Sequence, residues 1–323
     1  MGTFRVLVTD RLSVKALERL KAQVGLDVRV NNQGSLKTSD LADIHAMLIR
    51  SKTTIDKRLL DQATELKFIV TATSGFDHID VLEAVKREIH VTFVPQANTQ
   101  SAAELTIGLM LSCARKLKLA QAAVDSGNWD RNPLMGMELQ NKTLGILGLG
   151  RVGSKVSKIA TAIGMEVLAF DPYITDEAFK QAGAKRSGRD EVYKMCDILT
   201  LHLPYTKETH HLINEKTLDV INHGIMLINT SRGKILVEPD IIAALKQGRI
   251  ESLGLDVFEK EPLALKSSLI KHPKVVLSPH IGANTAEAFE RASQSAVDKI
   301  LAFREGGEPD LDRLTKETLC LQL

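Results

Sequence analysis

The sequence lacks the cysteine pattern of a disulfide framework or a zinc site. Its 323 residues include only three cysteines, Cys113, Cys196 and Cys320, which are odd in number, widely spaced and without a CxxC pair. Disulfide-rich secreted domains and structural zinc sites both need paired or closely spaced cysteines. The sequence therefore predicts no metal site and a reducing compartment, and we expect Cys113, in an apolar helical stretch, to be a core residue.

The sequence also lacks a charge excess of either sign and any long hydrophobic run. The 42 Lys and Arg residues against 40 Asp and Glu residues give a net charge of +2, which argues against nucleic-acid and membrane-surface partners. No apolar run approaches the about 20 residues that a membrane span needs. The start, "MGTFRVLVTD", runs directly into a strand pattern without a signal-peptide core. We expect a cytoplasmic protein.

Strand and helix patterns alternate along most of the chain. Strand-like apolar runs stand at 5–10, 46–50, 66–72, 90–95, 143–148, 166–170, 197–203, 225–230, 252–258 and 275–280. Helical patterns fill many of the gaps, at 13–23, 54–63, 81–88, 151–164 and 238–247. Alternation with short connections predicts an α/β protein with parallel sheets that are covered by helices.

Length and two further helical segments predict two domains. A chain of 323 residues is too long for one ordinary core. The segment 99–120 is apolar almost all round, which indicates a helix buried between domains or against another subunit. The last helix, 286–306, is expected to cross back to the first domain. We therefore predict one domain from 1–98 and 285–323, and a second from 99–284.

A glycine motif follows the strand pattern at 143–148. "TLGILGLGRVGSKV" contains Gly148-x-Gly150-x-x-Gly153, placed after a strand and at the start of a helix. In that context the glycines allow a tight turn, the approach of a pyrophosphate to the helix N-terminus and close packing of helix on strand. Asp171 ends the next strand, where a carboxylate binds the ribose hydroxyls of NAD and repels the extra phosphate of NADP. Arg151, inside the motif, either touches the pyrophosphate or is solvated.

Charged side chains follow three later strands. Arg232 comes three residues after the buried run "IMLIN" ends, and His280 follows "VVLSP". Asp256, Glu259 and Glu261 lie in "GLDVFEKEP". Ligands of open parallel sheets bind at the carboxyl ends of strands. Arg binds a carboxylate in a bidentate fork, and His with a neighbouring carboxylate transfers protons near neutral pH. These residues predict a site that binds an anion and performs acid–base chemistry.

At these motifs the sequence resembles the NAD-dependent D-isomer-specific 2-hydroxyacid dehydrogenases, and among them most the D-3-phosphoglycerate dehydrogenases. The resemblance covers roughly 45–300. The motifs that carry it are "LIRSKT", "TSGFDHID", "NTQSAAELTIGLML", "GNWDRNPLMGMELQNKTLGILGLGRVG", "LHLPYTKETHHLIN", "INTSRG", "LDVFEKEP" and "SPHIGANT". It implies two doubly wound parallel-sheet domains, with a Rossmann NAD-binding domain inserted in a flavodoxin-like substrate domain.

The resemblance also implies roles for individual residues. Arg232 binds the substrate, Glu261 is the partner of the histidine, and His280 is the acid–base. The implied cofactor-binding residues are Gly148, Gly150, Arg151, Val152, Gly153, Asp171, Pro204, Thr230, Asp256 and Gly282. The backbone at Ser74 and Gly75 is expected to bind the substrate carboxylate. Val237 departs from the family, whose members commonly carry Asp there, and no basic residue stands near Thr71, where many phosphoglycerate dehydrogenases have one.

The resemblance implies an NAD-dependent oxidoreductase and a homodimer built around 99–120. For the substrate we expect 3-phosphoglycerate and 3-phosphohydroxypyruvate, in serine biosynthesis. Arg50 and Lys52, two residues apart at a strand end, share one side if the chain is extended there and would bind the phosphate with Arg131. Two alternatives remain open, a glyoxylate or hydroxypyruvate reductase and an NAD-sensing binding protein without catalytic activity.

Overall fold

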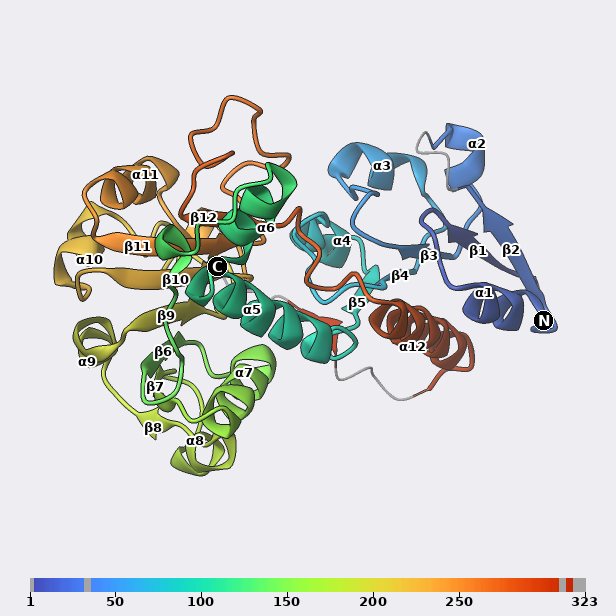
Figure 1. Ribbon diagram of the computed structural model, residues 1–323. Coiled ribbons are helices and arrows are strands. Elements are labelled where there is room, and N and C mark those ends of the chain that lie inside the picture. Colours follow the sequence, from blue (N-terminus) through green and yellow to red (C-terminus); the bar gives the residue numbers. More distant parts are fainter. Residues whose placement is uncertain (1–2, 32–35, 308–311, 316–323) are drawn as a thin grey trace. The chain divides into compact units, whose positions relative to one another are not determined.

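The chain divides into two compact units, each built on its own sheet (Figure 1). The computed structural model describes residues 3–31, 36–307 and 312–315, so Cys320 lies outside the described residues. Unit 1 comprises Met1–Asn98 and Ala283–Leu323, and unit 2 comprises Thr99–Gly282. The sequence placed these boundaries at 98 and 284. In the described part of the chain, no helix combines the length and apolar character needed to cross a membrane.

Unit 1 contains a six-stranded sheet with the order β13-β5-β4-β3-β1-β2. Its strands are β1 (Phe4–Val8), β2 (Leu26–Val30), β3 (Ala46–Ile49), β4 (Phe68–Thr71), β5 (His90–Phe93) and β13 (Arg313–Leu314). All pairs are parallel except β13 with β5, which is antiparallel. Every residue of β3 and β4 is buried, as expected for parallel strands covered on both faces.

Helices cover both faces of the unit 1 sheet. They are α1 (Val14–Lys21), α2 (Thr38–Leu41), α3 (Lys57–Gln62), α4 (Val81–Lys86) and α12 (Ala286–Arg304). Successive strand residues point to opposite faces, so Leu7 and Met47 pack with α2, α3 and α4, whereas Val6 and Leu48 pack with α1 and α12. The sheet is therefore the middle of three layers, and in Figure 1 its strands lie between α2 and α3 on one side and α1 and α12 on the other.

The last long helix joins the first residues of the chain. Helix α12 contacts α1 and β4, and Ser13 N–H donates to Ser293 Oγ at 3.1 Å. Arg304 donates to the carbonyl of Val24 at 2.6 Å. Thr285 caps the helix by accepting from Ala288 N–H. Helix α12 is therefore part of unit 1 and packs on elements from the first part of the chain.

Unit 2 contains a seven-stranded, all-parallel sheet with the order β12-β11-β10-β9-β6-β7-β8. Its strands are β6 (Thr143–Leu147), β7 (Glu166–Phe170), β8 (Lys185–Arg186), β9 (Ile198–Leu201), β10 (Ile225–Asn229), β11 (Ile250–Leu255) and β12 (Val275–Leu277). Its α-helices are α5 (Thr99–Ala114), α6 (Leu117–Asp125), α7 (Arg151–Ala162), α8 (Asp176–Ala182), α9 (Arg189–Met195), α10 (Glu215–Val220) and α11 (Glu238–Lys246). Short 3₁₀ turns, η1 (Asn132–Leu134) and η2 (Gly233–Ile235), follow α6 and β10.

Two apolar layers enclose the unit 2 sheet. Ile146 and Ile228 face the layer with α5, α7 and α8, and Leu147 and Leu227 face the layer with α9, α10 and α11. The carboxyl ends of all seven strands lie at one edge, because the strands are parallel. The predicted fold, an α/β protein with two doubly wound sheets, is confirmed.

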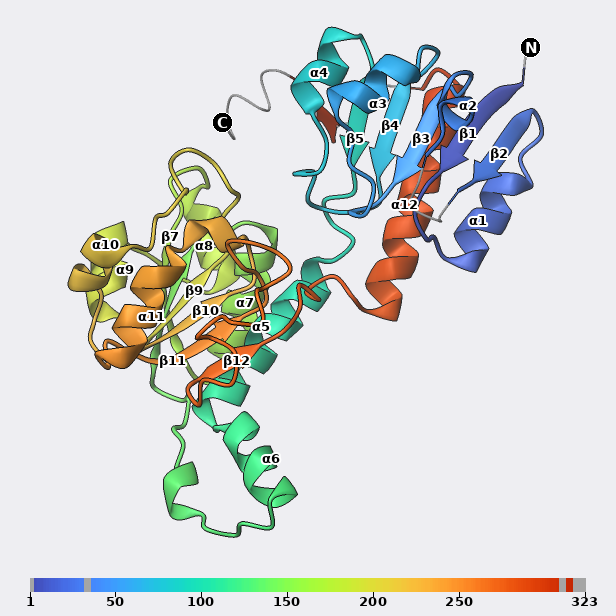
Figure 2. The ribbon, with the colours of Figure 1, turned by 90° about the horizontal axis from the view of Figure 1, so that it is seen from above.

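The apolar segment 99–120 is not one helix, contrary to the sequence prediction. Helix α5 ends at Ala114 and α6 begins at Leu117, because Lys116 adopts a left-handed backbone with φ of +51°. Helix α6 and the segment after it extend away from the sheet of unit 2 (Figure 2). Leu117, Val124, Trp129 and Met135 are exposed there, so only α5 is a buried helix.

Several elements were missed because their sequences carry no strong apolar pattern. Strand β2 reads LDVRV and lies at the sheet edge without a fully buried residue. Strand β8 has two exposed residues, Lys185 and Arg186. Helices α2, α8, α9 and α10 have four to seven residues, too short for a 3.6-residue period to be clear.

Candidate active site

The glycine motif forms a tight turn between β6 and α7. Gly148 has a φ of +87°, and a Cβ there would lie 2.5 Å from the carbonyl oxygen of His202. A Cβ on Gly153 would lie 2.1 Å from the carbonyl oxygen of Gly148, so only glycine allows α7 to pack this closely on the turn. Gly150 is exposed, and a Cβ there would meet no atom within 4 Å. The turn thus presents open backbone at the N-terminus of α7, as a bound pyrophosphate requires.

Asp171 lies beside this turn at the end of β7. Its Oδ2 accepts from Leu149 N–H at 2.9 Å, and its Oδ1 accepts from Tyr173 N–H at 3.0 Å. A carboxylate oxygen accepts more than one hydrogen bond, so each retains capacity for a ribose hydroxyl. Asp171 therefore has a second task that the sequence did not reveal, because it ties the glycine turn to the loop after β7.

Arg232 lies directly after β10, at the N-cap of η2. It is half-buried, and its Nη1 donates to the carbonyl of Ser231 at 2.8 Å. The preceding loop is fixed by Asn229, whose Oδ1 accepts from both the N–H and the hydroxyl of Ser231. Asn229 also donates to the carbonyl of Arg232 at 2.9 Å. This fully buried Asn thus shapes the loop that presents the guanidinium.

Glu261 and His280 form a hydrogen-bonded pair at the carboxyl ends of β11 and β12. Glu261 Oε2 lies 2.7 Å from Nδ1 of His280, and Glu261 Oε1 accepts from Phe258 N–H at 3.1 Å. The hydrogen bond from Glu261, with its charge, raises the pKa of His280 above its ordinary value, although burial opposes this. Burial acts to raise the pKa of Glu261, but His280, the Phe258 N–H and Arg232 outweigh it and lower that pKa. Glu261 is thus held ionised and its histidine is made more basic.

Asp256 organises the loop that carries His280. Its carboxylate is fully buried and accepts from Ser278 Oγ at 2.6 Å, Ile281 N–H at 2.8 Å and Gly282 N–H at 2.8 Å. The backbone N–H of His280 donates to the carbonyl of Asp256 at 2.8 Å. His280 itself has a φ of +54°, and these bonds fix its unusual backbone. Sequence reasoning gave Asp256 and Gly282 contacts to the cofactor, and the structure shows them bonded to each other.

An apolar cavity opens beside the Glu261–His280 pair. It has a volume of about 620 Å³ and is lined by Phe258, Leu263, Ile270 and Leu277, among others, together with both members of the pair. Few polar groups surround the pair on this side, while the side chains of His280 and Glu261 keep 51% and 37% of their surface exposed, so a substrate can reach them.

The other predicted cofactor residues lie just after the carboxyl ends of β6, β9 and β10 in unit 2. Thr230 Oγ1 is 2.8 Å from Thr106 Oγ1, and Thr106 in turn bonds back to Ala102 in α5. The carbonyl of Pro204 accepts from Thr209 at 2.6 Å. Arg151 is exposed at the start of α7, and the next residue, Val152, is half-buried. Burial lowers the pKa of the nearby His202 to about 3, so this histidine is neutral.

In unit 1 the loop of Ser74 and Gly75 is shaped by hydroxyl groups. Thr73 Oγ1 donates to the carbonyl of Gly75 at 2.7 Å and lies 2.6 Å from Thr71 Oγ1. Thr71 Oγ1 lies 3.1 Å from Nε2 of His78. Ser74 and Gly75 are half-buried in this loop.

Arg50 lies at the carboxyl end of β3 with its guanidinium over an aromatic ring. The guanidinium carbon is 4.9 Å from the ring centroid of Phe289, and Nη1 is buried without a hydrogen-bond partner among the described residues. Burial lowers the pKa of Arg50, and the charge of Asp10 opposes this shift. A desolvated cation with an unused donor is suited to binding an anion.

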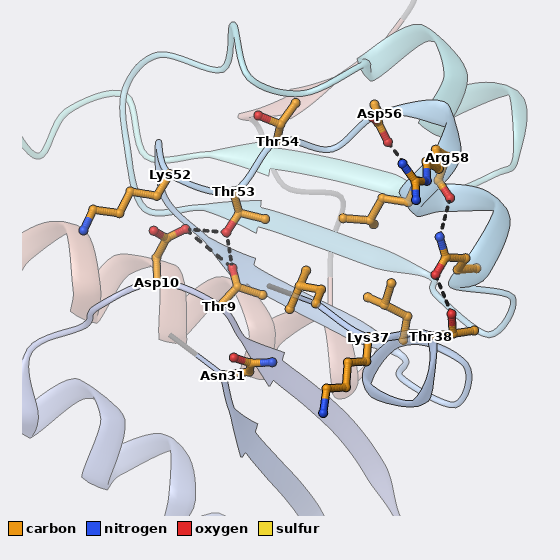
Figure 3. Close-up of a pocket in the computed structure, with 14 residues that line it drawn as sticks. Thr9, Asp10, Asn31, Lys37, Thr38, Lys52, Thr53, Thr54, Asp56 and Arg58 are labelled. Atoms are coloured by element: carbon orange, nitrogen blue, oxygen red, sulfur yellow. Dashed lines mark hydrogen bonds between the residues drawn. The ribbon is translucent and has the colours of Figure 1, made fainter. Parts of the chain in front are cut away.

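Lys52 does not share the surroundings of Arg50. The sequence placed Arg50 and Lys52 on one side only if the chain between them is extended. It is not extended, because Thr53 N–H donates to the Arg50 carbonyl in a turn. Lys52 lines a cavity of about 690 Å³ with Asp10, Lys37 and others, and Figure 3 shows a floor in which Thr53 is bonded to Thr9 and Asp10. In this view the side chains of Lys52 and Lys37 point in different directions, and their ammonium groups do not converge. Arg58 lines this cavity as well, whereas Arg50 does not, so Arg50 and Lys52 do not line one common cavity.

Arg131 is exposed in unit 2, at the start of η1 in the segment that follows α6.

Three residues whose contacts the sequence did not predict are His211, Glu238 and Glu259. His211 Nε2 lies 3.1 Å from Glu259 Oε1, and Glu238 exchanges hydrogen bonds with Glu259. Of these three, only Glu259 had a signal in the sequence, as part of the acidic cluster "DVFEKEP". In the described part of the chain, no cluster of His, Cys, Asp and Glu has the form of a metal site.

Comparison with known proteins bears on both units. Residues 107–282 match the family described as D-isomer specific 2-hydroxyacid dehydrogenase, NAD binding domain. The chain is 38% identical to a D-3-phosphoglycerate dehydrogenase of Bacillus subtilis over 94% of its own length. It spans only 57% of that relative, and a similar share of the archaeal phosphoglycerate dehydrogenases that it matches.

Two further relatives are matched over nearly their whole length. A glyoxylate reductase of Thermococcus litoralis is 36% identical, with 94% of this chain and 95% of the relative covered. Among solved structures, D-lactate dehydrogenase from Aquifex aeolicus, complexed with NAD and lactic acid, is 30% identical with a TM-score of 0.83. That match covers 94% of this chain and 96% of the other.

Proposed function

We propose, because this chain belongs to the D-isomer specific 2-hydroxyacid dehydrogenase family, that it interconverts a D-2-hydroxy acid and its 2-oxo acid with NAD. The observation that carries this proposal is the 2.7 Å contact between Glu261 and His280. It lies on the sheet edge that also carries Arg232 and the Gly148 turn. One edge thus combines an acid–base pair, a cation and a dinucleotide turn.

The glycine turn fits a dinucleotide by its own geometry. Gly150 leaves the backbone open, and Gly148 and Gly153 allow approaches that a Cβ would prevent. Gly148, Gly150 and Gly153 would hold the pyrophosphate, and Asp171 would bind the adenosine ribose. When bound, the nicotinamide supplies or accepts the hydride at C2 of the substrate.

His280 transfers the proton in this proposal. Its Nδ1 is engaged by the ionised Glu261, which leaves Nε2 as the nitrogen that faces a substrate oxygen. In the reduction, Nε2–H of the imidazolium donates to the oxygen of the 2-oxo group. In the oxidation, neutral Nε2 accepts the hydroxyl proton. Glu261 stabilises the imidazolium and fixes the orientation of the ring.

Arg232 binds the substrate acid and polarises its 2-oxo group. A guanidinium offers parallel N–H donors that match a carboxylate and an adjacent carbonyl oxygen. Because Asn229 fixes the loop of Arg232, this cation is positioned before the substrate arrives. The Ser74–Gly75 backbone in unit 1 is proposed as a second contact for the carboxylate.

For the substrate we propose 3-phosphoglycerate and 3-phosphohydroxypyruvate, a pair of serine biosynthesis. The support is Arg50, whose buried and unpartnered Nη1 suits the added phosphate charge, and the phosphoglycerate dehydrogenase relatives. Arg131 is proposed as a further phosphate contact. The separate surroundings of Lys52 leave it as the weakest member of the predicted set.

A glyoxylate or hydroxypyruvate reductase is the second candidate. The observation in its favour is the glyoxylate reductase relative, which matches over 95% of its own length, whereas the Bacillus subtilis phosphoglycerate dehydrogenase matches over 57%. With an unphosphorylated substrate Arg50 would have no phosphate to bind, and its guanidinium would only pack over the ring of Phe289.

The decisive experiment follows NADH absorbance with phosphohydroxypyruvate, hydroxypyruvate, glyoxylate and pyruvate. We expect reduction of all four to some extent, with the highest kcat/KM for phosphohydroxypyruvate. A preference for glyoxylate or hydroxypyruvate supports the second candidate. Tight NADH binding without reduction of any 2-oxo acid refutes the dehydrogenase and leaves an NAD-sensing binding protein.

We propose that the protein acts in the cytoplasm as a homodimer built on α5, α6 and the segment after them. The support is the exposed apolar side chains of Leu111, Leu117, Val124, Trp129 and Met135. Such a concentration of exposed apolar groups is typical of an interface. Sedimentation at micromolar concentration should give about twice the 35.5 kDa chain mass, and a monomer would refute this part.

A further inference from the structure

Three loops meet behind the Glu261–His280 pair at the carboxyl edge of the unit 2 sheet. His211 lies on the loop after β9, Glu238 begins α11, and Glu259 lies on the loop after β11. His211 Nε2 is 3.1 Å from Oε1 of Glu259, and both side chains are about one-third exposed. Glu259 stands two residues before Glu261, so this contact acts on the segment that carries the catalytic carboxylate.

Glu238 and Glu259 fasten the same segment to the start of α11. Glu238 N–H donates to Oε2 of Glu259 at 3.3 Å, and Glu259 N–H donates to Oε1 of Glu238 at 2.8 Å. The N-cap of α11 is Val237, which has no side-chain acceptor. The first N–H groups of a helix need acceptors from outside the helix. Glu259 supplies one from the neighbouring loop.

His211 is itself fixed to the segment of Arg232. Its φ is +53°, a conformation that is costly for a residue with a Cβ. Its N–H donates to the carbonyl of Lys234 at 2.9 Å, and its carbonyl accepts from Asn214 Nδ2 at 2.8 Å. Lys234 lies two residues after Arg232. The backbone of His211 is therefore held by bonds that do not involve Glu259, and its ring also stacks on the ring of His210 at 3.7 Å.

The contact between the Arg232 and Glu261 segments leaves no free space. A Cβ on Gly233 would lie 1.8 Å from the carbonyl oxygen of Phe258, so the two backbones touch. Phe258 N–H donates to Glu261 Oε1 at 3.1 Å. Glu259 directly follows Phe258 and lies two residues before Glu261, so a displacement of Glu259 is expected to move both Glu261 and the Phe258 N–H that holds its carboxylate.

The two carboxylates of this cluster, those of Glu238 and Glu259, also need a hydrogen-bond donor. Burial and the charge of Glu259 both raise the pKa of Glu238, while the hydrogen bond from Glu259 N–H opposes them. Two carboxylates that face each other repel. His211 donates a hydrogen bond to Glu259 in either protonation state if its proton is on Nε2, and it adds a positive charge when protonated.

We propose that His211, Glu238 and Glu259 are positioning residues that hold Glu261 against His280. The proposal rests on the proposed function in taking Glu261 and His280 as the acid–base pair of the reaction. Loss of the His211–Glu259 contact should let the 256–262 loop shift, and small misplacements of catalytic groups cost large factors in rate.

The test compares His211→Leu and Glu259→Ala with His211→Gln, which keeps a donor, and with His223→Leu. His223 is an exposed histidine in the turn before β10 and is the matched control. The readouts are kcat and KM for the 2-oxo acid, the dissociation constant of NADH, the thermal midpoint, and an NMR titration of the His280 ring. The titration reports the influence of Glu261 against that of Arg232 and Asp256, the other charges that act on this ring.

We expect His211→Leu and Glu259→Ala to lower kcat on the order of tenfold, the scale of a misplaced catalytic group, with NADH binding within about twofold of native. The pKa of His280 should fall toward the ordinary value, and His211→Gln should restore most of both properties. His223→Leu should be native in all of them. Should His211→Leu fail to fold, His211→Gln against Glu259→Ala gives the same comparison.

Folded His211→Leu and Glu259→Ala proteins with native kcat and native His280 titration would overturn the proposal. Equal losses of kcat and of NADH binding, with an unchanged His280 titration, would overturn it as well, because they indicate a general structural role. The titration needs no substrate. A native protein that reduces no 2-oxo acid therefore refutes the proposed function, while the His280 shift still tests the positioning.

Discussion

The two units use the same kind of sheet in different ways. Both have buried parallel strands covered by helices, and both place polar residues at the carboxyl ends of strands. In unit 1 this edge is shaped mainly by hydroxyl bonds, such as those of Thr53 and Thr73. In unit 2 the hydroxyls of Ser231 and Ser278 take part as well, but this edge also has close glycine contacts at Gly153 and Gly233 and the hydrogen-bonded Glu261–His280 pair.

This difference indicates a division of labour. Close backbone contacts and paired charges hold a reacting group within a narrow range of positions, which bond making requires. Hydroxyl networks give a rigid loop that offers neutral donors and acceptors to a ligand. We therefore expect unit 2 to set the rate of the chemical step and unit 1 to select the substrate. The four predictions below test that division.

The largest effect is expected at His280 in unit 2. His280→Ala should lower kcat by on the order of 10²–10⁴-fold, because a positioned general acid–base contributes this much. NADH binding should change little. Stopped-flow or steady-state NADH absorbance measures the rate, and His223→Ala serves as the surface control. A loss below about threefold would remove His280 from the chemical step.

Arg50 should show the opposite pattern in unit 1. Arg50→Ala should lower kcat/KM for phosphohydroxypyruvate by about 10- to 100-fold, the worth of a hydrogen bond to a charged group. The values for hydroxypyruvate and glyoxylate should stay within about threefold. Lys52→Ala should lower kcat/KM less, since Lys52 lines a cavity that Arg50 does not line. Equal losses on all three substrates would contradict a phosphate role and the selective role of unit 1.

Asp171 should control the choice of cofactor with a smaller effect. Asp171→Ala should narrow the preference for NADH over NADPH by about tenfold, since it removes a charge that repels the 2′-phosphate and a ribose acceptor. Asp171→Ala also removes the acceptor of Leu149 N–H, which accounts for part of any loss of stability in this variant. Asp176→Ala, in the first turn of α8, is the matched control. A native protein that uses both cofactors equally would refute the ribose contact.

The smallest effect is a shift of the pH profile in Glu261→Gln. The hydrogen bond and charge of Glu261 raise the pKa of His280, so His280 stays protonated to a higher pH in the native protein. Reduction of a 2-oxo acid needs the protonated ring, so kcat/KM falls as pH rises through that pKa. Glu261→Gln should move this falling limb to lower pH. An unchanged limb would show that Glu261 and His280 are not coupled.

Sequence reasoning reached the parts of the molecule that depend on local pattern. Buried strands such as IMLIN and the Gly148 turn were clear, because their apolar runs and glycine spacing have one structural solution. Edge strand β2 and the short helices were not, because their burial comes from tertiary contacts. The break at Lys116 could not be read from "ARKLKLA", since nothing in those residues demands a left-handed backbone.

The residues of the candidate site also differ in whether local sequence pattern could indicate their role. Arg232, Glu261 and His280 carry reactive groups and stood at strand ends, so their types and order indicated a role. Asp256 looked like a cofactor contact, and only the structure shows its carboxylate bonded to Ser278, Ile281 and Gly282. The His211–Glu259 contact joins residues 48 apart in sequence on two different loops. No pattern in one chain reveals a pairing of that kind.

The helix α12 has a consequence for the order in which the protein can fold. It covers one face of the unit 1 sheet, yet it is made after all of unit 2, and its bond from Ser13 to Ser293 spans 280 residues. Unit 2 is continuous, so it can fold while synthesis proceeds. Until the last helix leaves the ribosome, α1 alone covers the face of the unit 1 sheet that carries Val6, Leu48 and Val70. A nascent chain that stops before α12 therefore contains a complete dinucleotide-binding unit beside a half-covered sheet, which is the species that chaperones would have to protect.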